Sequence, residues 1–332
     1  MYERFFGFDA RPFDLTPDPR FLVATAAHRE ALSNLEYGIA SRKGLTLLVG
    51  EAGTGKTTVI RAAIDRQPAR VHCVYIYNPA LTREEFVEML ASHFELSDRA
   101  RTSKTAMLLE LEALLRRRIA QGETSVLVVD EAQSLPLELL EEVRLLANAE
   151  TTEGKLLSVI MAGQPELAAR LNEPILRQLK QRVGLRCELR PLELHETATY
   201  ISGRIAAAGG AGSQVFTRDA VAMIHARSRG IPRTISVIAD NVLLSAFALG
   251  RRPATSEIVA EVCRDFDLGE RQDVAPRHAS AAPTGRTDAR DPQRTVLAIE
   301  GDDVAKRGGS GEPPASGIFS QMYPKRRRFS FF

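Results

Sequence analysis

One stretch of the sequence has the residue types and the spacing that are needed to hold a chain of phosphate groups. It reads, in order, Gly50, Glu51, Ala52, Gly53, Thr54, Gly55, Lys56, Thr57 and Thr58, and it fits the pattern G-x-x-x-x-G-K-[ST]. Glycines at these positions let the backbone turn tightly and point its N–H groups at phosphate oxygens. Lys56 is then expected to reach the β- and γ-phosphates, and the Thr57 hydroxyl to bind Mg²⁺. The stretch therefore predicts a site for a nucleoside triphosphate with Mg²⁺.

A pair of acidic residues supplies the second part of the same chemistry. Asp130 and Glu131 directly follow the apolar run 126–129 and open the sequence Asp-Glu-Ala-Gln. Asp130 is expected to hold Mg²⁺ through its water shell, while Glu131 stays free to orient and polarise an attacking water. The alternative is an acidic helix cap after a strand. The phosphate loop earlier in the chain favours hydrolysis over that alternative.

Both motifs follow apolar, β-branched segments that are typical of buried parallel strands. Strands are predicted at residues 45–49, 71–77, 125–129, 156–162 and 185–189, and helices at 26–42, 57–66, 82–94, 102–121, 137–149, 166–171 and 175–183. Strands that alternate with helices predict an α/β fold with a parallel, doubly wound sheet over residues 45–190. The helix that begins after the phosphate loop would turn the positive end of its dipole toward the phosphates.

The regions on either side of this core have different compositions. Residues 194–266 predict helices only, at 194–208, 217–228, 232–248 and 255–265. Residues 1–25 hold five phenylalanines among three prolines, which predicts an ordered strap without a helix. The expected domains are therefore the strap 1–25, the nucleotide-binding domain 26–192, a helical lid 193–266 and a disordered tail 267–332 with a basic, aromatic end.

Composition excludes several classes of protein. The net charge of +2 does not indicate nucleic acid or an anionic surface as a partner of the whole chain. The three cysteines are far apart and fit neither a disulfide framework nor a metal site, which suits a reduced cytoplasmic protein. The first residues lack the apolar region of a signal peptide, and no apolar run is long enough to span a bilayer.

The two motifs, followed by an all-helical region, resemble the AAA+ ATPases, in which they are called Walker A and Walker B. The resemblance implies ATP as the nucleotide, with four further residues at its site. Gln164, after the next strand, matches sensor 1, which holds the attacking water. Arg233, at the start of a lid helix, matches sensor 2, which folds over the γ-phosphate. Asn78 matches the residue that pairs with the Walker B glutamate, and Pro232, with the strap, would form a wall of the adenine pocket.

The resemblance also implies an arginine finger that reaches the ATP of a neighbouring subunit. The helix before the last strand offers Arg177 and Arg182. Arg182 is preferred because the end of this helix is expected closest to the carboxyl edge of the sheet, although an ordinary basic helix face remains the alternative for each residue. A finger of this kind predicts a homo-oligomer whose ATP site is completed between subunits.

A narrower resemblance, over residues 1–266, is carried by the aromatic N-terminus and by short motifs. These are AHREAL (27–32), AGQPEL (162–167), LRQLKQR (176–182), LRPL (189–192) and GIPR (230–233). They are similar to secretion ATPases of the general secretion pathway protein A type, and to relatives beside pilus and exopolysaccharide–exosortase loci. The membrane span and the peptidoglycan-binding domain of the secretion protein are not expected here.

Three functions fit these observations. The first is a cytoplasmic ATPase, peripheral at the inner membrane, that energises envelope secretion, pilus or polysaccharide export. The tail, with Lys325 and the arginines 326–328, would touch anionic lipid weakly or act only as a solubilising terminus. The second is a DNA-binding ATPase like the transposition regulators of the same family, with basic clusters at 116–118 and 251–252. The third is a scaffold that binds nucleotide without hydrolysis, which an intact Glu131 opposes.

Overall fold

The computed structural model describes residues 1–15, 25–77, 81–152, 154–211 and 214–267, which all lie in one compact unit, Met1–Asp273. Several predictions lie outside the described residues. These are the part of the strap at 16–24, Asn78, and the tail from residue 268 onward. Within the described part of the chain, no helix combines the length and the apolar character that a membrane crossing requires.

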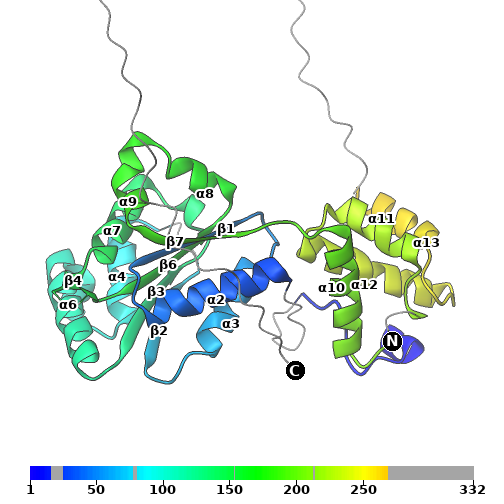
Figure 1. Ribbon diagram of the computed structural model, residues 1–332, viewed down its shortest axis with the longest axis horizontal. Helices are drawn as coiled ribbons and strands as arrows, with labels where there is room; N and C mark the ends of the chain where they lie inside the picture. The colour runs from blue at the N-terminus through cyan, green and yellow to red at the C-terminus, as the bar shows by residue number, and fades with distance from the viewer. Residues whose placement is uncertain (16–24, 78–80, 153, 212–213, 268–332) are drawn as a thin grey trace, which may run out of the picture. The chain divides into compact units, whose positions relative to one another are not determined.

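A five-stranded parallel sheet forms the core, in the strand order β2-β3-β6-β1-β7 (Figure 1). The strands are β1 (Leu45–Gly50), β2 (Val71–Ile76), β3 (Thr124–Val129), β6 (Ser158–Gly163) and β7 (Val183–Leu189). All four neighbouring pairs are parallel, as predicted, so the carboxyl ends of the strands share one edge. At that edge β1 lies between β6 and β7, because Val49 pairs with Gly163 and Gly50 with Leu189.

Helices cover both faces of the sheet, because successive strand residues point to opposite sides. One face packs on α2 (Ala26–Ala40) and α3 (Lys56–Asp65) through residues such as Leu48 and Val128. The other face packs on α4 (Arg83–His93), α6 (Lys104–Ala120) and α7 (Leu137–Ala147) through residues such as Leu47 and Val129. The apolar runs of the strands are continuous because both faces are buried, and Figure 1 shows this doubly wound arrangement.

Two details of the core differ from the sequence-based expectation. The helix predicted at 102–121 is α6, but a short helix that was not predicted, α5 (Asp98–Thr102), precedes it, because Ser97 and Ser103 each cap a helix. A hairpin of two-residue strands, β4 (Glu150–Thr151) and β5 (Gly154–Lys155), was not predicted because such short strands have no hydrophobic pattern. The short helices predicted at 166–171 and 175–183 are present as α8 (Pro165–Arg170) and, together, the 3₁₀ turn η3 (Pro174–Leu176) and α9 (Arg177–Gln181).

The helical region after the sheet consists, in the described residues, of four helices close to the predicted ones. They are α10 (Leu194–Ala207), α11 (Arg218–Ser228), α12 (Pro232–Ala248) and α13 (Ser256–Asp265). They share one apolar cluster, separate from the two clusters on the faces of the sheet.

The first fifteen residues pack on this helical region, with Tyr2, Phe6, Phe8 and Phe13 buried in its core. The buried guanidinium of Arg204, on α10, donates hydrogen bonds to the backbone oxygens of Pro12 and Asp14, at 2.6 and 2.9 Å. The prediction that this segment contains no helix is wrong, because α1 (Tyr2–Phe6) ends at Gly7, before the first proline. The described part of the strap therefore belongs to the core of this helical region.

Candidate nucleotide-binding site

The phosphate loop connects β1 to α3 and packs tightly against its surroundings. Gly53 and Gly55 have φ angles of 82° and 98°, the left-handed region in which glycine is favoured. Gly50 has another reason to be glycine. A Cβ at this position would lie 2.7 Å from both the carbonyl oxygen of Leu189 and the Thr54 hydroxyl. Gly53 and Gly55 thus permit the backbone conformation of the turn, and Gly50 permits its close packing against strand β7.

Lys56 is the buried cation of this loop, with only 4% of its surface exposed. Its Nζ donates to the carbonyl oxygens of Gly50 at 2.8 Å and of Glu51 at 3.1 Å. Burial lowers the pKa of Lys56, while the carboxylates of Glu131 and Asp130 oppose that shift. The carbonyl oxygens at the start of the loop thus hold the Lys56 ammonium group in place.

Asp130 is buried at the end of β3, and its carboxylate is held by three donors. Oδ2 accepts hydrogen bonds from the Thr57 hydroxyl at 2.6 Å and from the Tyr75 hydroxyl at 2.8 Å. Oδ1 accepts from the backbone N–H of Glu131 at 2.9 Å. The strand order β2-β3-β6-β1 and the loop after β1 thus bring the two predicted metal residues into direct contact.

The oxygens of Thr57 and Asp130 fit Mg²⁺. This ion prefers hard oxygen ligands, and it is usually held by one or two protein groups together with substrate phosphates and waters. The described residues contain no cluster of three or more His, Cys, Asp or Glu side chains that would hold a metal by itself. A single carboxylate beside a hydroxyl at the phosphate loop is the donor set that a nucleotide-bound Mg²⁺ requires.

Glu131 has an unusual backbone conformation, and one oxygen of its carboxylate accepts hydrogen bonds. Its φ angle is 53°, a left-handed conformation that side chains rarely adopt. Its Oε2 accepts from Gln133 Nε2 at 2.6 Å and from Gln164 Nε2 at 3.4 Å. Gln133 also accepts from the backbone N–H of Gln164 at 3.0 Å, so the two glutamines are joined. The structure therefore brings Gln164, the residue predicted as sensor 1, into contact with Glu131.

Pro232 and Arg233 begin helix α12 directly beside the phosphate loop. The backbone N–H of Arg233 donates to the carbonyl oxygen of Gly53 at 3.2 Å, and a Cβ on Gly53 would lie 2.8 Å from the Arg233 Cβ. Pro232 is buried, whereas the Arg233 side chain is exposed. Helix α12 is thus joined to the loop through its backbone.

The structure corrects the reason for preferring Arg182 as the arginine finger. Arg182 directly precedes β7, whose first residue, Val183, pairs in parallel with Leu45 at the start of β1. Arg182 therefore lies at the amino edge of the sheet, opposite the phosphate loop. Arg177, at the other end of α9, is also exposed. Position within one subunit therefore does not favour Arg182 as the finger.

Three residues of the site were not singled out by the sequence. Tyr75 fits the pattern of an ordinary strand residue, although burial and then the Asp130 charge raise its pKa and keep the hydroxyl protonated. Gln133 lies three positions after Asp130 in the motif, and this was the available sequence signal. His28, on α2, contacts the carbonyl oxygen of Thr54 in the phosphate loop. Tyr75 and His28 make contacts between segments that are distant in the sequence.

Comparison with known proteins identifies the region that contains these residues. The family model described as "AAA domain" matches residues 39–171. The chain is 42% identical over 254 residues to General secretion pathway protein A of Aeromonas hydrophila, covering 75% of this chain and 46% of that protein. It is 31% identical over 128 residues to the Mu-like prophage FluMu DNA transposition protein B of Haemophilus influenzae, covering 37% and 40% of the two chains. The chain thus spans less than half the length of these relatives.

Solved structures support the fold. The ORC2 protein of Aeropyrum pernix, in complexes with ADPNP and ADP, matches with a TM-score of 0.57 and 17% identity, covering 77% of this chain and 72% of that one. Cdc6p of Pyrobaculum aerophilum matches with a TM-score of 0.57 and 17% identity, covering 76% and 70%. At these identities the likeness shows a shared α/β core of the AAA type with a helical region after it.

Proposed function

Because the chain is an AAA-domain protein related to General secretion pathway protein A, we propose that it binds ATP with Mg²⁺ and hydrolyses it to ADP and phosphate. The observation that carries this proposal is the contact between Thr57 and Asp130, at 2.6 Å, beside the buried Lys56. A hydroxyl, a carboxylate and an ammonium group from the two motifs meet at the carboxyl edge of the sheet. This is the arrangement that phosphoryl transfer to water uses.

Each residue has a separate task in the proposed reaction. Bound Mg²⁺ would supply charge neutralisation at the phosphates. Lys56 and the N–H groups of residues 50–58 bind the phosphate oxygens, while Thr57 and Asp130 hold the metal. Glu131 accepts a proton from the attacking water through the carboxylate oxygen that the glutamines leave free. Gln164 orients that water, and Arg233 stabilises the γ-phosphate from the lid.

The test of hydrolysis separates binding from turnover. Glu131→Gln keeps the shape of the side chain but removes its basicity, so we expect unchanged ATP binding and a loss of turnover of about 100-fold or more. Lys56→Ala should weaken ATP binding itself. Steady-state phosphate release and calorimetric titration measure the two quantities. Turnover that is unchanged in Glu131→Gln would contradict the assignment of the base.

We also propose that the ATP site is completed by an arginine from a neighbouring copy, either Arg177 or Arg182. Both are exposed and therefore accessible to a neighbour. Mixing Glu131→Gln subunits with subunits that lack one arginine tests this directly. The first kind supplies the arginine and the second kind keeps its own base, so activity should return in the mixture. An arginine whose loss is not rescued in this way does not act between subunits.

The proposed process is envelope secretion, pilus or polysaccharide export on the cytoplasmic side of the membrane. The support for it is the relationship to General secretion pathway protein A, which extends over 75% of this chain. Deletion of the gene should block export of one envelope component, and only a hydrolysis-competent copy should restore it. Restoration by Glu131→Gln would show that hydrolysis is not required. The basic tail is tested separately, by sedimentation with anionic lipid vesicles at low and high salt.

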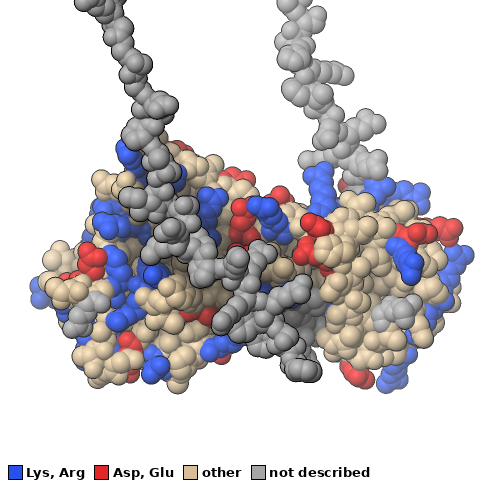
Figure 2. Space-filling model, in the orientation of Figure 1, with Lys and Arg blue, Asp and Glu red and all other residues tan. Residues whose placement is uncertain are grey.

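A DNA-binding ATPase is the second candidate, and the relationship to the prophage transposition protein favours it. Figure 2 shows Lys and Arg side chains, with Asp and Glu side chains among them, on the described part of this face, and a stripe of basic side chains is what DNA tracking uses. Duplex DNA offered with ATP at several salt concentrations decides between the two candidates. Binding that falls steeply with salt would support the DNA function, and no binding at low salt would remove it.

A further inference from the structure

His28 is a buried histidine whose two ring nitrogens both have partners. It lies in the first turn of α2, and 6% of its surface is exposed. Nε2 lies 3.0 Å from the carbonyl oxygen of Thr54, and Nδ1 lies 2.8 Å from the hydroxyl oxygen of Thr25. Because Thr54 belongs to the phosphate loop, the histidine ties the start of α2 to that loop.

The partners fix the protonation of the imidazole ring. A carbonyl oxygen only accepts hydrogen bonds, so the proton must be on Nε2. Nδ1 then accepts from the Thr25 hydroxyl, whose oxygen also accepts the backbone N–H of His28 as the cap of the helix. Burial lowers the pKa of His28, which favours the neutral ring.

The contact with Thr54 determines the orientation of one peptide plane. In a trans peptide the C=O and the following N–H point in opposite directions. A Thr54 carbonyl held by His28 therefore directs the Gly55 N–H away from α2. Gly55 is the N-cap of α3, and the N–H groups at a helix start have no acceptor within the helix. A Cβ at Gly55 would lie 3.2 Å from His28 Nε2, so glycine is the residue that admits this close approach.

We propose that His28 is a positioning residue, which holds the Thr54–Gly55 peptide so that the Gly55 N–H is presented to a phosphate of the bound nucleotide. This inference rests on the proposed ATP binding and deepens it. A peptide that is already oriented does not lose conformational freedom when the phosphate binds. Without the histidine, the peptide is free to rotate. Orienting it on binding then costs conformational entropy, which weakens the affinity for the nucleotide.

Two conservative substitutions test the role of the Nε2 donor. In His28→Gln the side-chain amide nitrogen is three bonds from Cβ, as Nε2 is, so it reaches Thr54. In His28→Asn the amide nitrogen is only two bonds away, so it does not. We expect the affinity for Mg²⁺–ADP, measured by calorimetry, to stay within about threefold in His28→Gln and to fall about tenfold in His28→Asn. Leu32→Ala, on the same helix, controls for destabilisation of α2 and should leave the affinity unchanged.

The tautomer provides a readout that does not depend on nucleotide. Long-range proton–nitrogen NMR correlations on the free protein should show His28 neutral, with the proton on Nε2. A proton on Nδ1, or equal ADP affinities of His28→Asn and wild type, would overturn this inference alone. Failure of the wild-type protein to bind ADP or ATP would instead overturn the proposed function, and the inference with it.

Discussion

At the scale of single residues, Glu131 combines a chemical role with an unfavourable backbone. Its φ angle of 53° places Cβ close to the backbone, which costs about 1 kcal/mol for a residue other than glycine. The turn directs the carboxylate toward Gln133 and Gln164, which hold it. Strain of this kind persists where the surrounding structure enforces it, and it is common at functional sites.

Alanine usually gives a more stable protein than glycine at the same position. The strain at Glu131 predicts the opposite order of stability there. Glu131→Gly should be more stable than Glu131→Ala by about 1 kcal/mol, because glycine adopts positive φ without the steric cost. Both variants should be inactive. Urea unfolding of the two proteins measures the difference. The opposite order would mean that the residue leaves the left-handed conformation once its side chain is removed.

Tyr75 provides the second prediction at this scale. Tyr75→Phe removes the hydrogen bond to Asp130 Oδ2 and leaves the Thr57 hydroxyl as the remaining side-chain donor to that oxygen in the described contacts. A hydrogen bond to a charged acceptor contributes about 1.5–3 kcal/mol, so the Mg²⁺ concentration needed for half-maximal ADP binding should rise about tenfold. Tyr77→Phe is the matched control, because Tyr77 stacks on Tyr75 but is largely exposed. Equal effects of the two substitutions would contradict this role.

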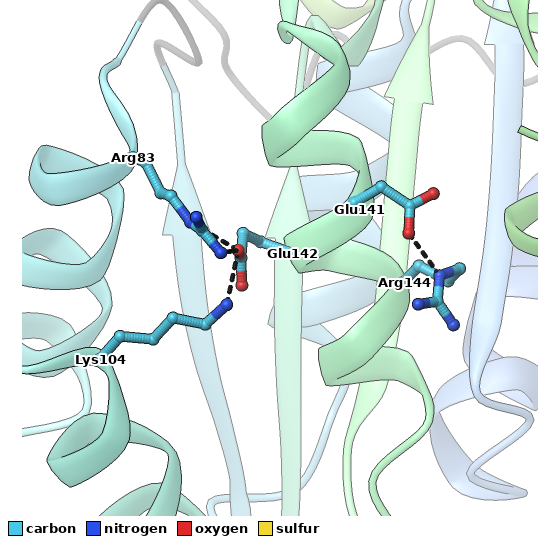
Figure 3. A network of polar contacts seen from close by, with 5 residues as sticks. All are labelled: Arg83, Lys104, Glu141, Glu142 and Arg144. Atoms are coloured by element: carbon cyan, nitrogen blue, oxygen red, sulfur yellow. Dashed lines mark hydrogen bonds and ion pairs between the residues drawn. The ribbon is translucent and has the colours of Figure 1, made fainter. Parts of the chain in front are cut away.

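At the scale of elements, a buried carboxylate joins three helices beside the sheet. Glu142, on α7, accepts from Arg83 at the start of α4 at 2.6 Å and from Lys104 at the start of α6 at 2.7 Å (Figure 3). The side chain of Glu142 is only 6% exposed. On the same helix, the Glu141 carboxylate is more exposed, at 37%, and pairs with Arg144 of that helix. The first contact therefore fixes packing between helices, and the second does not.

This difference predicts unequal costs for two identical changes. Glu142→Gln leaves two cations without their carboxylate, and we expect a loss of about 1–2 kcal/mol in the free energy of unfolding, since both cations keep partial access to water. Glu141→Gln should cost about 0.5 kcal/mol or less. Denaturant unfolding of both variants provides the comparison. Similar losses would show that burial of Glu142 does not strengthen its contacts.

The elements themselves were largely predictable from the sequence. Strands such as β1 and β3 are continuous apolar runs, and α4 begins where the helix 82–94 was predicted, at a capping box of Thr82 and Glu85. The phosphate loop and the acidic pair are local motifs, and each directly follows a strand. Because the strands are parallel, both motifs lie at the same edge of the sheet, where they can meet. The partners Tyr75 and His28 were not predictable, because hydrogen bonds between distant segments have no local pattern. The position of Arg182 was misjudged because helix α9 ends at the amino edge of the sheet.

At the scale of the whole described molecule, the N-terminal segment completes the helical region. Arg204 donates to the backbone of Pro12 and Asp14, and Phe13 packs edge-on against Phe216. The helical region therefore draws its core from residues on both sides of the α/β core in the sequence. Its helix α12 also contacts the phosphate loop, through the backbone of Arg233.

The hydrogen bonds of the buried Arg204 guanidinium predict that its loss exposes the backbone of residues 1–15 to solvent. Arg204→Gln cannot reproduce the forked donors, so residues 1–15 should lose protection from amide hydrogen exchange by about tenfold or more. Arg252→Gln is the control, because Arg252 is exposed and its bonds to this segment and to Gln214 are 3.3 Å or longer. Exchange followed by mass spectrometry resolves the peptide. Equal loss in both variants would contradict a special role for Arg204.

The burial of the first residues in the helical region has a consequence for synthesis of the protein. The Tyr2 hydroxyl donates a hydrogen bond to the carboxylate of Asp240, which lies 238 positions later in the chain. At a translation rate of about 5–20 residues per second, the N-terminal aromatic side chains leave the ribosome about 10–50 s before their partners exist. The sheet domain lies between them in the sequence and is finished first. During this interval the phenylalanines lack their native partners, and their apolar surface is exposed on the growing chain.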